Sequence, residues 1–467
     1  MKKGRTRFEL DEKTLKVVDD MVVAEQHYLA ERARLAEGEG SDPAPIRRIS
    51  SRRHFMAAAA AGLVGAGVLP KIVHAAVPPG AVDRYAPADP SKTPGTPTGD
   101  DGGYGSRSQF ETEVRWRFPT PTKESSWTMT PLGGSMGIIT PSGLHYERHH
   151  SGIATIDPAK HVLYVHGMVE RPKKYSMADI KRMPSISRTH MMECSGNGLT
   201  EWTKPTLKTV QGTHGLTSTS EWTGVPMALI MKEVGVMPGA KWVLAEGDDG
   251  AVMTRSLPIE KMYEDAFLAY GQNGEALRPE QGYPLRINTP GWEGNTSIKW
   301  VRRLEFSDVP FETREETSKY TDLMPNGKAR QFTFIMEAKS VITFPSGEMK
   351  LPGPGFYEVT GLAWSGRGKI TRVEVSSNGG QTWSDAQMQG PVLPICHTRF
   401  RLPWYWDGKP AILQSRCTDE TGYVQPTIKQ LTDVRGTNGP IASIYHLNGI
   451  QSWAVAANGS VSNVHHF

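Results

Sequence analysis

Between about residues 109 and 327, short apolar runs alternate with polar and Gly/Pro-rich stretches. Short runs rich in β-branched and aromatic residues predict strands, whereas apolar positions three and four residues apart in Met227–Val234 predict a helix. The expected strands are His161–Val165, Trp242–Ala245, Leu285–Asn288 and Trp300–Phe306. Strands and helices mixed with long loops are typical of an α+β domain, which we assign to residues 109–327.

After about residue 328, β-rich runs follow one another without helical periodicity between them. The expected strands are Phe332–Ile335, Gly355–Ala363, Ile370–Ser376, Thr398–Leu402 and Ala411–Thr418. Asn378-Gly379-Gly380 and Asp407-Gly408 are typical hairpin turns. The pattern predicts an immunoglobulin-like β-sandwich over residues 328–450, followed by a C-terminal tail, residues 451–467.

The N-terminal region contains an apolar run, Ala57–Leu69, directly after Ser51–Met56 with its paired arginines. Paired arginines, a short Ala/Gly-rich run and small residues up to Ala76 are typical of a twin-arginine export signal. A buried Ala-rich helix is the alternative. The run is too short for a stable membrane anchor. We therefore expect a precursor extension over residues 1–76, an exposed arm over 77–108, and export of the folded protein to the periplasm.

The net charge gives no sign of a nucleic-acid partner. The 467 residues include 53 Lys and Arg and 49 Asp and Glu, a formal charge of +4. Residues 1–76 hold 13 of the basic and 10 of the acidic residues, which leaves the remainder at about +1. Nucleic-acid binding requires a basic face, so this near-neutral body argues against it.

Among the three cysteines, Cys194 stands on a Gly/Asn-rich turn, Ser195–Gly198, directly after an apolar stretch. A thiolate on such a turn could enter a cleft and bind a transition metal, although a structural buried cysteine is the simpler reading. Cys396 and Cys417 flank the expected hairpin at Asp407-Gly408, where they could form a disulfide or remain free. No P-loop, H-E-x-x-H, C-x-x-C-H or paired C-x-x-C motif is present.

Basic and imidazole groups occur on both sides of Cys194 in the sequence, within Tyr146–His150, Gly282–Arg286 and Ser297–Trp300. Groups of this kind on short loops next to strands can hold a phosphorylated cofactor through charge-assisted hydrogen bonds. Each would more often be a solvated surface charge if it stood alone. Together with the Cys194 thiol, these groups indicate a cofactor site.

From about Tyr146 to near the C-terminus, the chain resembles the sulfite oxidase family of molybdenum enzymes. Three segments are most similar in sequence to its sulfane dehydrogenase branch, which acts in bacterial thiosulfate oxidation: Glu193–Gly198, Thr217–Trp222 and Thr418–Pro426. The resemblance implies a molybdopterin-binding domain followed by a β-sandwich that forms a homodimer. It also implies oxidation of sulfur with oxygen taken from water.

The resemblance implies a role for eleven residues. Cys194 matches the molybdenum ligand of a cofactor with one pyranopterin, and Arg148 and Tyr320 match groups that position the substrate. The residues implied to bind the cofactor, besides Cys194, are Arg148, His149, His150, Asp249, Gln281, Arg286, Ser297, Ile298 and Lys299.

Several positions depart from the family pattern. Gln281 stands where a histidine is frequent, Gly198 and Leu199 replace arginines, and Asn448 replaces a late arginine. Fewer point charges predict a more open, less cationic site, suited to sulfur on a carrier protein rather than to free sulfite. Sulfite dehydrogenase activity is the alternative.

The electrons require an external acceptor, since no haem attachment motif is present. We expect a c-type cytochrome subunit, within a hetero-oligomer. Arg399–Trp406 could contact it, although a packed strand is the simpler reading.

A second hypothesis within the fold is a periplasmic reductase that resembles its methionine-sulfoxide-reducing members. Those members lack the sandwich, so the β-rich residues 328–445 argue against it. A non-catalytic periplasmic scaffold with the same fold would not need the thiol of Cys194.

Overall fold

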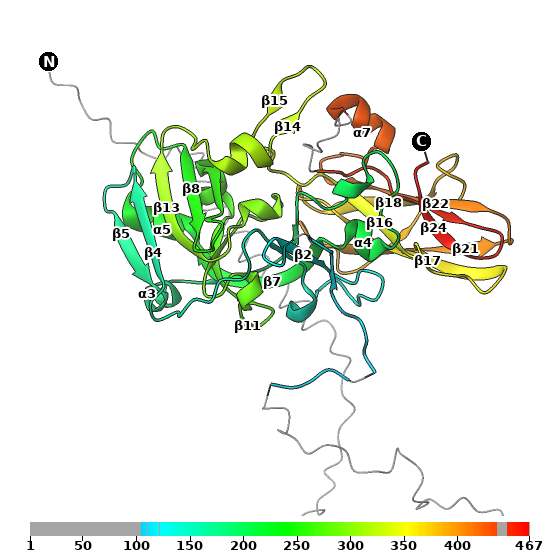
Figure 1. The fold of residues 1–467 in the computed structure, drawn as a ribbon, viewed down its shortest axis with the longest axis horizontal. Coiled ribbons are helices and arrows are strands. Elements are labelled where there is room, and N and C mark those ends of the chain that lie inside the picture. Colours follow the sequence, from blue (N-terminus) through cyan, green and yellow to red (C-terminus); the bar gives the residue numbers. More distant parts are fainter. Residues whose placement is uncertain (1–103, 109, 121, 437–445, 467) are drawn as a thin grey trace, which may run out of the picture. The chain divides into compact units, whose positions relative to one another are not determined.

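The computed structural model describes residues 104–108, 110–120, 122–436 and 446–466 (Figure 1). The expected export signal lies outside these residues. From Glu113 onward the described chain forms one compact unit. Residues 104–108 and 110–112 belong to a separate unit and are exposed.

One mixed and one antiparallel sheet form the first domain, which extends from β1 (Trp116–Arg117) to the short helix η6 (Glu315–Lys319). One sheet has the order β5 (Lys173–Ser176), β4 (Val162–Gly167), β13 (Val301–Ser307), β8 (Trp242–Gly247) and β9 (Thr254–Pro258). The other has the order β11 (Glu275–Ala276), β10 (Phe267–Gln272), β7 (Thr217–Pro226) and β6 (Ile186–Glu193), with β12 (Arg286–Asn288) also paired to β10.

Smaller elements complete the first domain. β1 pairs with β2 (Ser126–Met129), which pairs with β3 (Glu147–His149). The helices are η2 (Ser142–Leu144), α3 (Met177–Arg182), η3 (Leu199–Glu201), α4 (Val210–His214), α5 (Met227–Val234), α6 (Ile259–Glu264), η4 (Pro279–Gln281) and η5 (Gly294–Thr296).

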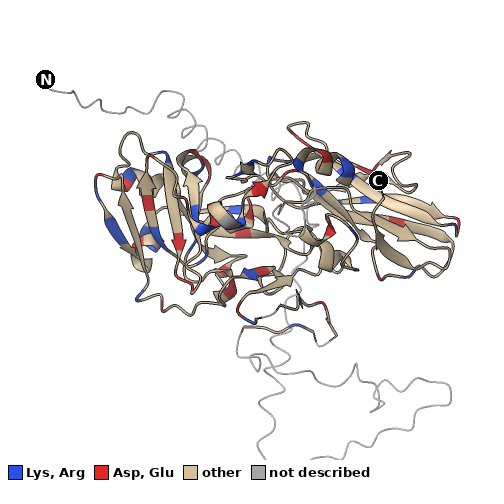
Figure 2. Cartoon of the chain, turned by 45° about the horizontal axis from the view of Figure 1, so that its top comes forward, with Lys and Arg blue, Asp and Glu red and all other residues tan. Residues whose placement is uncertain are grey.

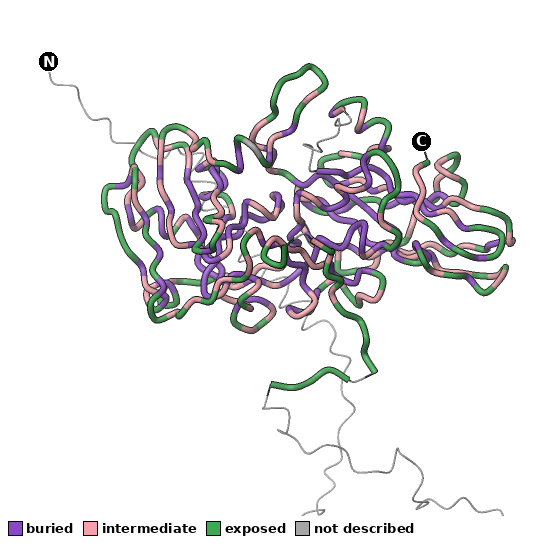
Figure 3. The backbone as a smooth tube through the Cα atoms, in the orientation of Figure 1, coloured by how far each residue is buried: buried purple, intermediate pink, exposed green. Residues whose placement is uncertain are grey.

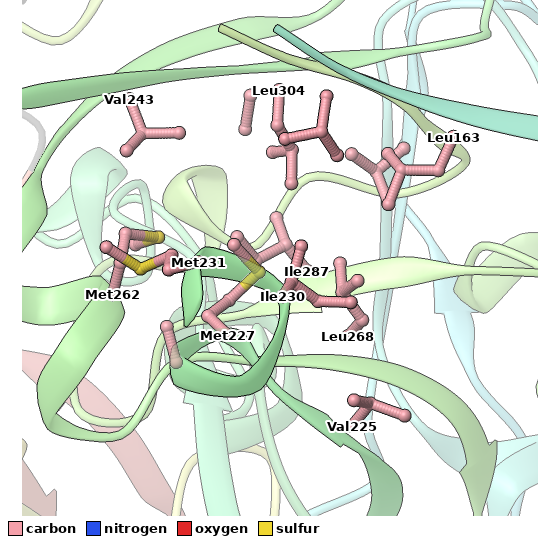
Figure 4. Packing of buried hydrophobic residues seen from close by; sticks show 14 of the residues in the cluster. Leu163, Val225, Met227, Ile230, Met231, Val243, Met262, Leu268, Ile287 and Leu304 are labelled. Carbon is pink, nitrogen blue, oxygen red and sulfur yellow. The ribbon is translucent and has the colours of Figure 1, made fainter. Parts of the chain in front are cut away.

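Helix α5 shows how the sequence pattern places the core of the first domain. Its buried residues Met227, Ile230, Met231 and Val234 share one face, and Gly235 ends the helix with a positive φ of 66°. This face packs among buried residues from strands of both sheets (Figure 4). The core thus brings together segments that lie far apart in the sequence.

A two-sheet sandwich follows the hairpin of β14 (Asp322–Leu323) and β15 (Ala329–Arg330), whose outer part is exposed and green in Figure 3. One sheet has the order β16 (Lys339–Phe344), β17 (Gly355–Trp364), β21 (Thr398–Trp406) and β20 (Gln387–Gln389). The other has the order β19 (Ser384–Asp385), β18 (Ile370–Ser376), β22 (Ala411–Asp419), β23 (Ser452–Val455) and β24 (Val461–Val464). Buried side chains from both sheets form the sandwich core. The α+β class with a following β-sandwich is confirmed.

Three local predictions in the sandwich are wrong. Residues 451–467 are not a tail, because β23 and β24 continue a sheet and Trp453 is fully buried. Phe332–Ile335 forms only an isolated bridge, Trp292 to Ile335, because it runs along the first domain rather than beside another strand. A helix, α7 (Ile428–Arg435), also occurs in a region where no helical pattern was expected.

The prediction of a hairpin at Asp407-Gly408 is also wrong, because the flanking strands β21 and β22 belong to different sheets. Cys396 and Cys417 are both free thiols. The Cys396 Sγ donates to the carbonyl of Thr189 on β6, 3.2 Å away, whereas Cys417 lies in the sandwich core. The two cysteines therefore have separate neighbours.

Strand β21 contains the stretch considered for a cytochrome contact. Phe400 and Trp406 are buried and Tyr405 is 74% exposed. Acidic and basic residues are interspersed over both domains (Figure 2). In the described ranges, no helix is both long and apolar enough to cross a bilayer.

Candidate active site

One pocket of the first domain collects all eleven implicated residues. The space between its lining atoms is about 660 Å³, which includes open solvent at its mouth. Its walls come from β3, the turn after β6, the segments around β12, the residues before β13, and Tyr320 after η6. Segments up to 172 residues apart, from Arg148 to Tyr320, therefore meet here.

Cys194 occupies the turn that follows β6. Its N–H donates to Leu216 O at 2.9 Å, and its carbonyl accepts from Asn197 N at 2.9 Å. Its side chain is partly exposed to the pocket. Burial raises the pKa of the thiol, and Arg148 opposes that rise. A bound cation would favour the thiolate in this setting.

His149 links Lys299 to an acidic group. Its Nδ1 lies 2.9 Å from Lys299 Nζ and its Nε2 lies 2.8 Å from Glu147 Oε2. Because an ammonium can only donate, Nδ1 accepts and the proton lies on Nε2. Burial and the Lys299 charge lower the pKa of His149 to about 4, so the ring is neutral. Glu147 also forms an ion pair with Arg115.

Among the described residues, Lys299 has no carboxylate in hydrogen-bonding contact. Besides His149, its Nζ donates to the carbonyls of Arg148 at 3.0 Å and Glu280 at 3.1 Å. Burial, together with repulsion from Arg286, lowers the pKa of Lys299 to about 7. An anionic group in the pocket would favour the charged ammonium.

The low pKa of Lys299 predicts a pH-dependent stability for protein prepared without cofactor. The folded pKa of about 7 lies below the ordinary value of about 10.4, so the unfolded chain binds the additional proton between these limits. The contribution of Lys299 to the free energy of unfolding should therefore rise as pH increases from 7 toward 10. Chemical denaturation of wild type and Lys299→Met should differ in this slope.

The exposed residue Lys232 supplies the control for that experiment. Lys232→Met should retain the wild-type slope. Equal slopes in wild type and Lys299→Met would contradict the prediction. In the cofactor-loaded protein, an anion beside Lys299 should reduce the difference between them.

Arg286, which is 2% exposed, lines the pocket and is held by several neighbouring groups. Its two terminal nitrogens donate to Gln281 O at 2.9 Å, Ser297 O at 3.1 Å and Met192 Sδ at 2.9 Å. Its guanidinium lies 4.9 Å from the Trp222 ring centroid. These contacts orient the guanidinium, and its buried Nε has no partner among the described residues.

Gln281, at the frequent histidine position, joins two walls of the pocket. Its amide donates to Tyr146 O at 2.9 Å, and its carbonyl oxygen lies 3.4 Å from Arg286 Nη1. A neutral amide thus orients an arginine without adding charge.

Three other implicated residues face the pocket while also serving the fold. The Ser297 hydroxyl accepts from Thr289 N at 3.1 Å, and Ile298 belongs to the core of the first domain. Asp249 accepts from Met253 N at 3.0 Å. These contacts show how their local backbone is held in place.

Tyr320 lines the pocket beside His150 and Arg148. The Tyr320 hydroxyl lies 3.3 Å from His150 Nε2, and Arg148 Nη2 lies 3.4 Å from His150 Nδ1. Burial and the charges of Arg148, Arg314, Lys299 and Lys319 lower the pKa of His150 to about 3. This wall therefore combines a neutral imidazole with a positive surrounding.

The departures Gly198, Leu199 and Asn448 do not line the pocket. Leu199 packs with an apolar cluster that includes Leu447, and Asn448 donates to Ala338 O in the sandwich region. The positive charge around His150 comes instead from Arg148, Lys299 and the segment of Arg314 and Lys319. These cations therefore partly offset the loss of positive charge that the departures from the family pattern predict for the pocket.

Glu147, Tyr146 and Asn295 also line the pocket but were not identified from the sequence. Asn295 Nδ2 donates to Ser195 Oγ at 3.0 Å, beside Cys194. The neighbouring Gly294 packs closely against Tyr146, since a Cβ at this position would lie 2.6 Å from Tyr146 Oη. The only sequence signal was their proximity to implicated residues.

The donor set fits a molybdopterin. Arg148, Arg286 and Lys299 outnumber the lining carboxylates Glu147 and Asp249, and Glu147 is already paired with Arg115. The unpartnered Nε of Arg286 and the depressed pKa of Lys299 both favour an anionic, acceptor-rich ligand. A thiol beside them suits a soft metal.

Comparisons with known proteins agree with this chemistry. Residues 150–315 match the family description "Oxidoreductase molybdopterin binding domain", and residues 330–452 match "Mo-co oxidoreductase dimerisation domain". The crystal structure of the sulfane dehydrogenase SoxCD from Paracoccus pantotrophus is similar, with 45% identity and a TM-score of 0.78. The match covers 82% of this chain and 99% of that chain.

Plant and algal nitrate reductases are more distant relatives. The enzyme from Ulva prolifera is 32% identical over 280 residues, which cover 53% of this chain and 32% of the relative. The enzyme from Solanum lycopersicum is 30% identical over 331 residues, which cover 62% of this chain and 36% of the relative. The chain thus spans about a third of the length of the curated relatives it matches.

Proposed function

Because the chain belongs to the sulfite oxidase family of molybdopterin oxidoreductases, we propose that it oxidises sulfane sulfur held on a carrier protein. The observation that carries this proposal is its 45% identity to a sulfane dehydrogenase over 99% of that chain. The convergence of all eleven implicated residues on one pocket supports it.

In this proposal Cys194 ligates molybdenum, while Arg286 and Lys299 hold the phosphate and the pterin ring. When bound, the cofactor would supply the two-electron oxidation of the substrate sulfur and the transfer of an oxygen atom that derives from water. Gln281 and Met192 orient Arg286 for this contact. His149 and the carbonyl of Arg148 hold Lys299 in place.

In the same proposal, Arg148, His150 and Tyr320 position the substrate. Arg148 presents a permanent positive charge that stabilises negative charge as it develops on oxygen. His150 is neutral at physiological pH because its pKa is about 3, so it serves as a hydrogen-bonding group. The Tyr320 hydroxyl lies within reach of this ring and orients the sulfur group.

Removing the Tyr320 hydroxyl should slow turnover without loss of cofactor. The Tyr320→Phe variant retains a buried ring, which lies 5.2 Å from the Arg255 guanidinium. Loss of one positioned donor should lower kcat by roughly 100-fold. Steady-state kinetics together with molybdenum content test this, with Tyr263→Phe in α6 as the control. An unchanged kcat would contradict the role assigned to Tyr320.

Sulfite dehydrogenase activity is the second candidate. The cations around His150, including Arg314 and Lys319, would favour a small oxyanion at the pocket mouth. The sulfane proposal is favoured because the similar sulfane dehydrogenase is matched over nearly its whole length.

Steady-state assays distinguish the two substrates. The purified holoenzyme is given either sulfite or a carrier protein with a cysteine persulfide, with a c-type cytochrome as electron acceptor. The proposal predicts a much higher kcat/KM for the persulfide-bearing protein. Efficient turnover of sulfite with none of the persulfide would overturn it.

We further propose that the enzyme works in the periplasm and passes electrons to a c-type cytochrome subunit. The paired arginines of Ser51–Met56 support export, and the dimerisation domain supports a homodimer. The similarity to the sulfane dehydrogenase SoxCD supports a hetero-oligomer. Replacing Arg52 and Arg53 by lysine should leave the holoenzyme in the cytoplasmic fraction. Normal export of this variant would contradict the assignment.

A further inference from the structure

The residue before Cys194 is a glutamate with no exposure to solvent. Three donors bind the Glu193 carboxylate: Lys339 Nζ at 2.5 Å and Asn197 Nδ2 at 2.9 Å on Oε1, and Trp364 Nε1 at 2.7 Å on Oε2. Asn197 belongs to the Cys194 turn, whereas Lys339 and Trp364 belong to the sandwich. The carboxylate therefore joins the two domains at the proposed metal ligand.

The sandwich presents its two donors as a unit. Lys339 begins β16 and Trp364 ends β17, and the antiparallel register sets them directly opposite each other. Both side chains are fully buried. Strand β16 lies beside α4 of the first domain (Figure 1), and Lys339 at its start contacts Glu193 at the end of β6.

The same contacts hold the turn itself. Lys339 Nζ also donates to Asn197 O at 3.3 Å, and Asn197 N donates to Cys194 O at 2.9 Å. Asn197 Oδ1 accepts from Leu216 N at 3.1 Å. The backbone on both sides of Cys194 is thus connected to the sandwich through Glu193, Asn197 and Lys339.

Stability alone does not account for a fully buried ion pair in this place. Apolar side chains of similar volume often serve a fold as well as a buried ion pair, because desolvation offsets the attraction. Hydrogen bonds of fixed direction, in contrast, orient a neighbouring group, and outer-shell contacts of this kind orient metal ligands.

We propose that Lys339 and Trp364 are positioning residues for Cys194, acting through Glu193. The sandwich thereby sets the direction of the cysteine sulfur in addition to forming the dimer. This inference rests on the role proposed for Cys194, but not on the identity of the sulfur substrate.

The test compares two buried tryptophans of the sandwich in the full holoenzyme. Trp364→Phe removes the donor to Glu193 but retains most of the ring. Trp453→Phe is the matched control, since Trp453 is also fully buried and donates to a backbone carbonyl, Ile342 O at 3.1 Å. The readouts are the cysteine-sulfur-to-molybdenum absorption band and the rate of molybdenum loss to a chelator.

We expect Trp364→Phe to shift the band and to lose molybdenum roughly 10-fold faster, while Trp453→Phe matches wild type. An unchanged Trp364→Phe band, or equal changes in both variants, would overturn the proposal. If Trp364→Phe does not fold, Glu193→Gln combined with Lys339→Met leaves no unpaired charge and takes its place. An unchanged band in that double variant would also overturn it.

Cys194→Ser separates this inference from the proposed function. If the serine variant retains the wild-type band, the ligand assignment and the positioning role both fail. If the serine variant loses the band while Trp364→Phe matches wild type, only the positioning role fails.

Discussion

The Cys194→Ser variant is expected to lose sulfur-oxidising activity by at least about 1,000-fold. Serine places a harder oxygen with a far higher pKa where the thiolate would bind molybdenum. The cysteine-dependent absorption band should disappear as well. Molybdenum analysis, visible absorption and steady-state turnover of purified protein measure the three quantities.

Cys417→Ser is the control, since Cys417 is a free buried thiol in the sandwich core and does not line the pocket. It should retain molybdenum, absorption and turnover. The result also tests whether the protein is an enzyme. A non-catalytic scaffold with this fold would contain no molybdenum in wild type or in either variant.

The Arg286→Met variant is expected to be isolated with less than about a tenth of the wild-type cofactor. Arg286 is buried, and its guanidinium faces the pocket from contacts that already orient it. Methionine is of similar length but removes the charge-assisted hydrogen bonds available to the pterin phosphate. Molybdenum and pterin contents, measured per folded chain, test this directly.

Arg303→Met on β13 is the matched control for Arg286→Met. Arg303 forms ion pairs with Glu246 and Glu305 near the surface and does not line the pocket. Its replacement should leave cofactor content unchanged. Wild-type cofactor content in Arg286→Met would contradict the phosphate-binding role, whereas thermal unfolding distinguishes lost binding from lost folding.

Local elements of the fold follow closely from the sequence pattern. Helix α5 spans Met227–Val234 and β18 spans Ile370–Ser376, as the apolar spacing predicts. These elements have short-range signals: an amphipathic period ended by Gly235 in one case, and a bounded β-branched run in the other. Pairing between strands has no comparable local signal.

Most of the errors concern such pairing, and the missed helix α7 is the exception. The turn at Asp407-Gly408 resembles a hairpin turn, yet β21 and β22 find better partners in opposite sheets. The sequence predicts a tail where β23 and β24 lie, because these strands depend on a distant partner. Strand β23, which contains Trp453, pairs with β22, and β24 pairs with β23. The run of residues in a strand can be read from the sequence, but its partner strand is set by the tertiary packing.

The sequence by itself determined the order of the two domains, the candidate residues around Cys194 and the chemistry that their types suit. It did so because turns, amphipathic periods and family motifs are properties of neighbouring residues. Only the tertiary structure decided that Glu193 is bound by Lys339, 146 positions away, and by Trp364, 171 positions away. It also decided that Cys396 and Cys417 remain apart. Packing creates these contacts, since burial excludes water and selects partners by position in space rather than along the chain.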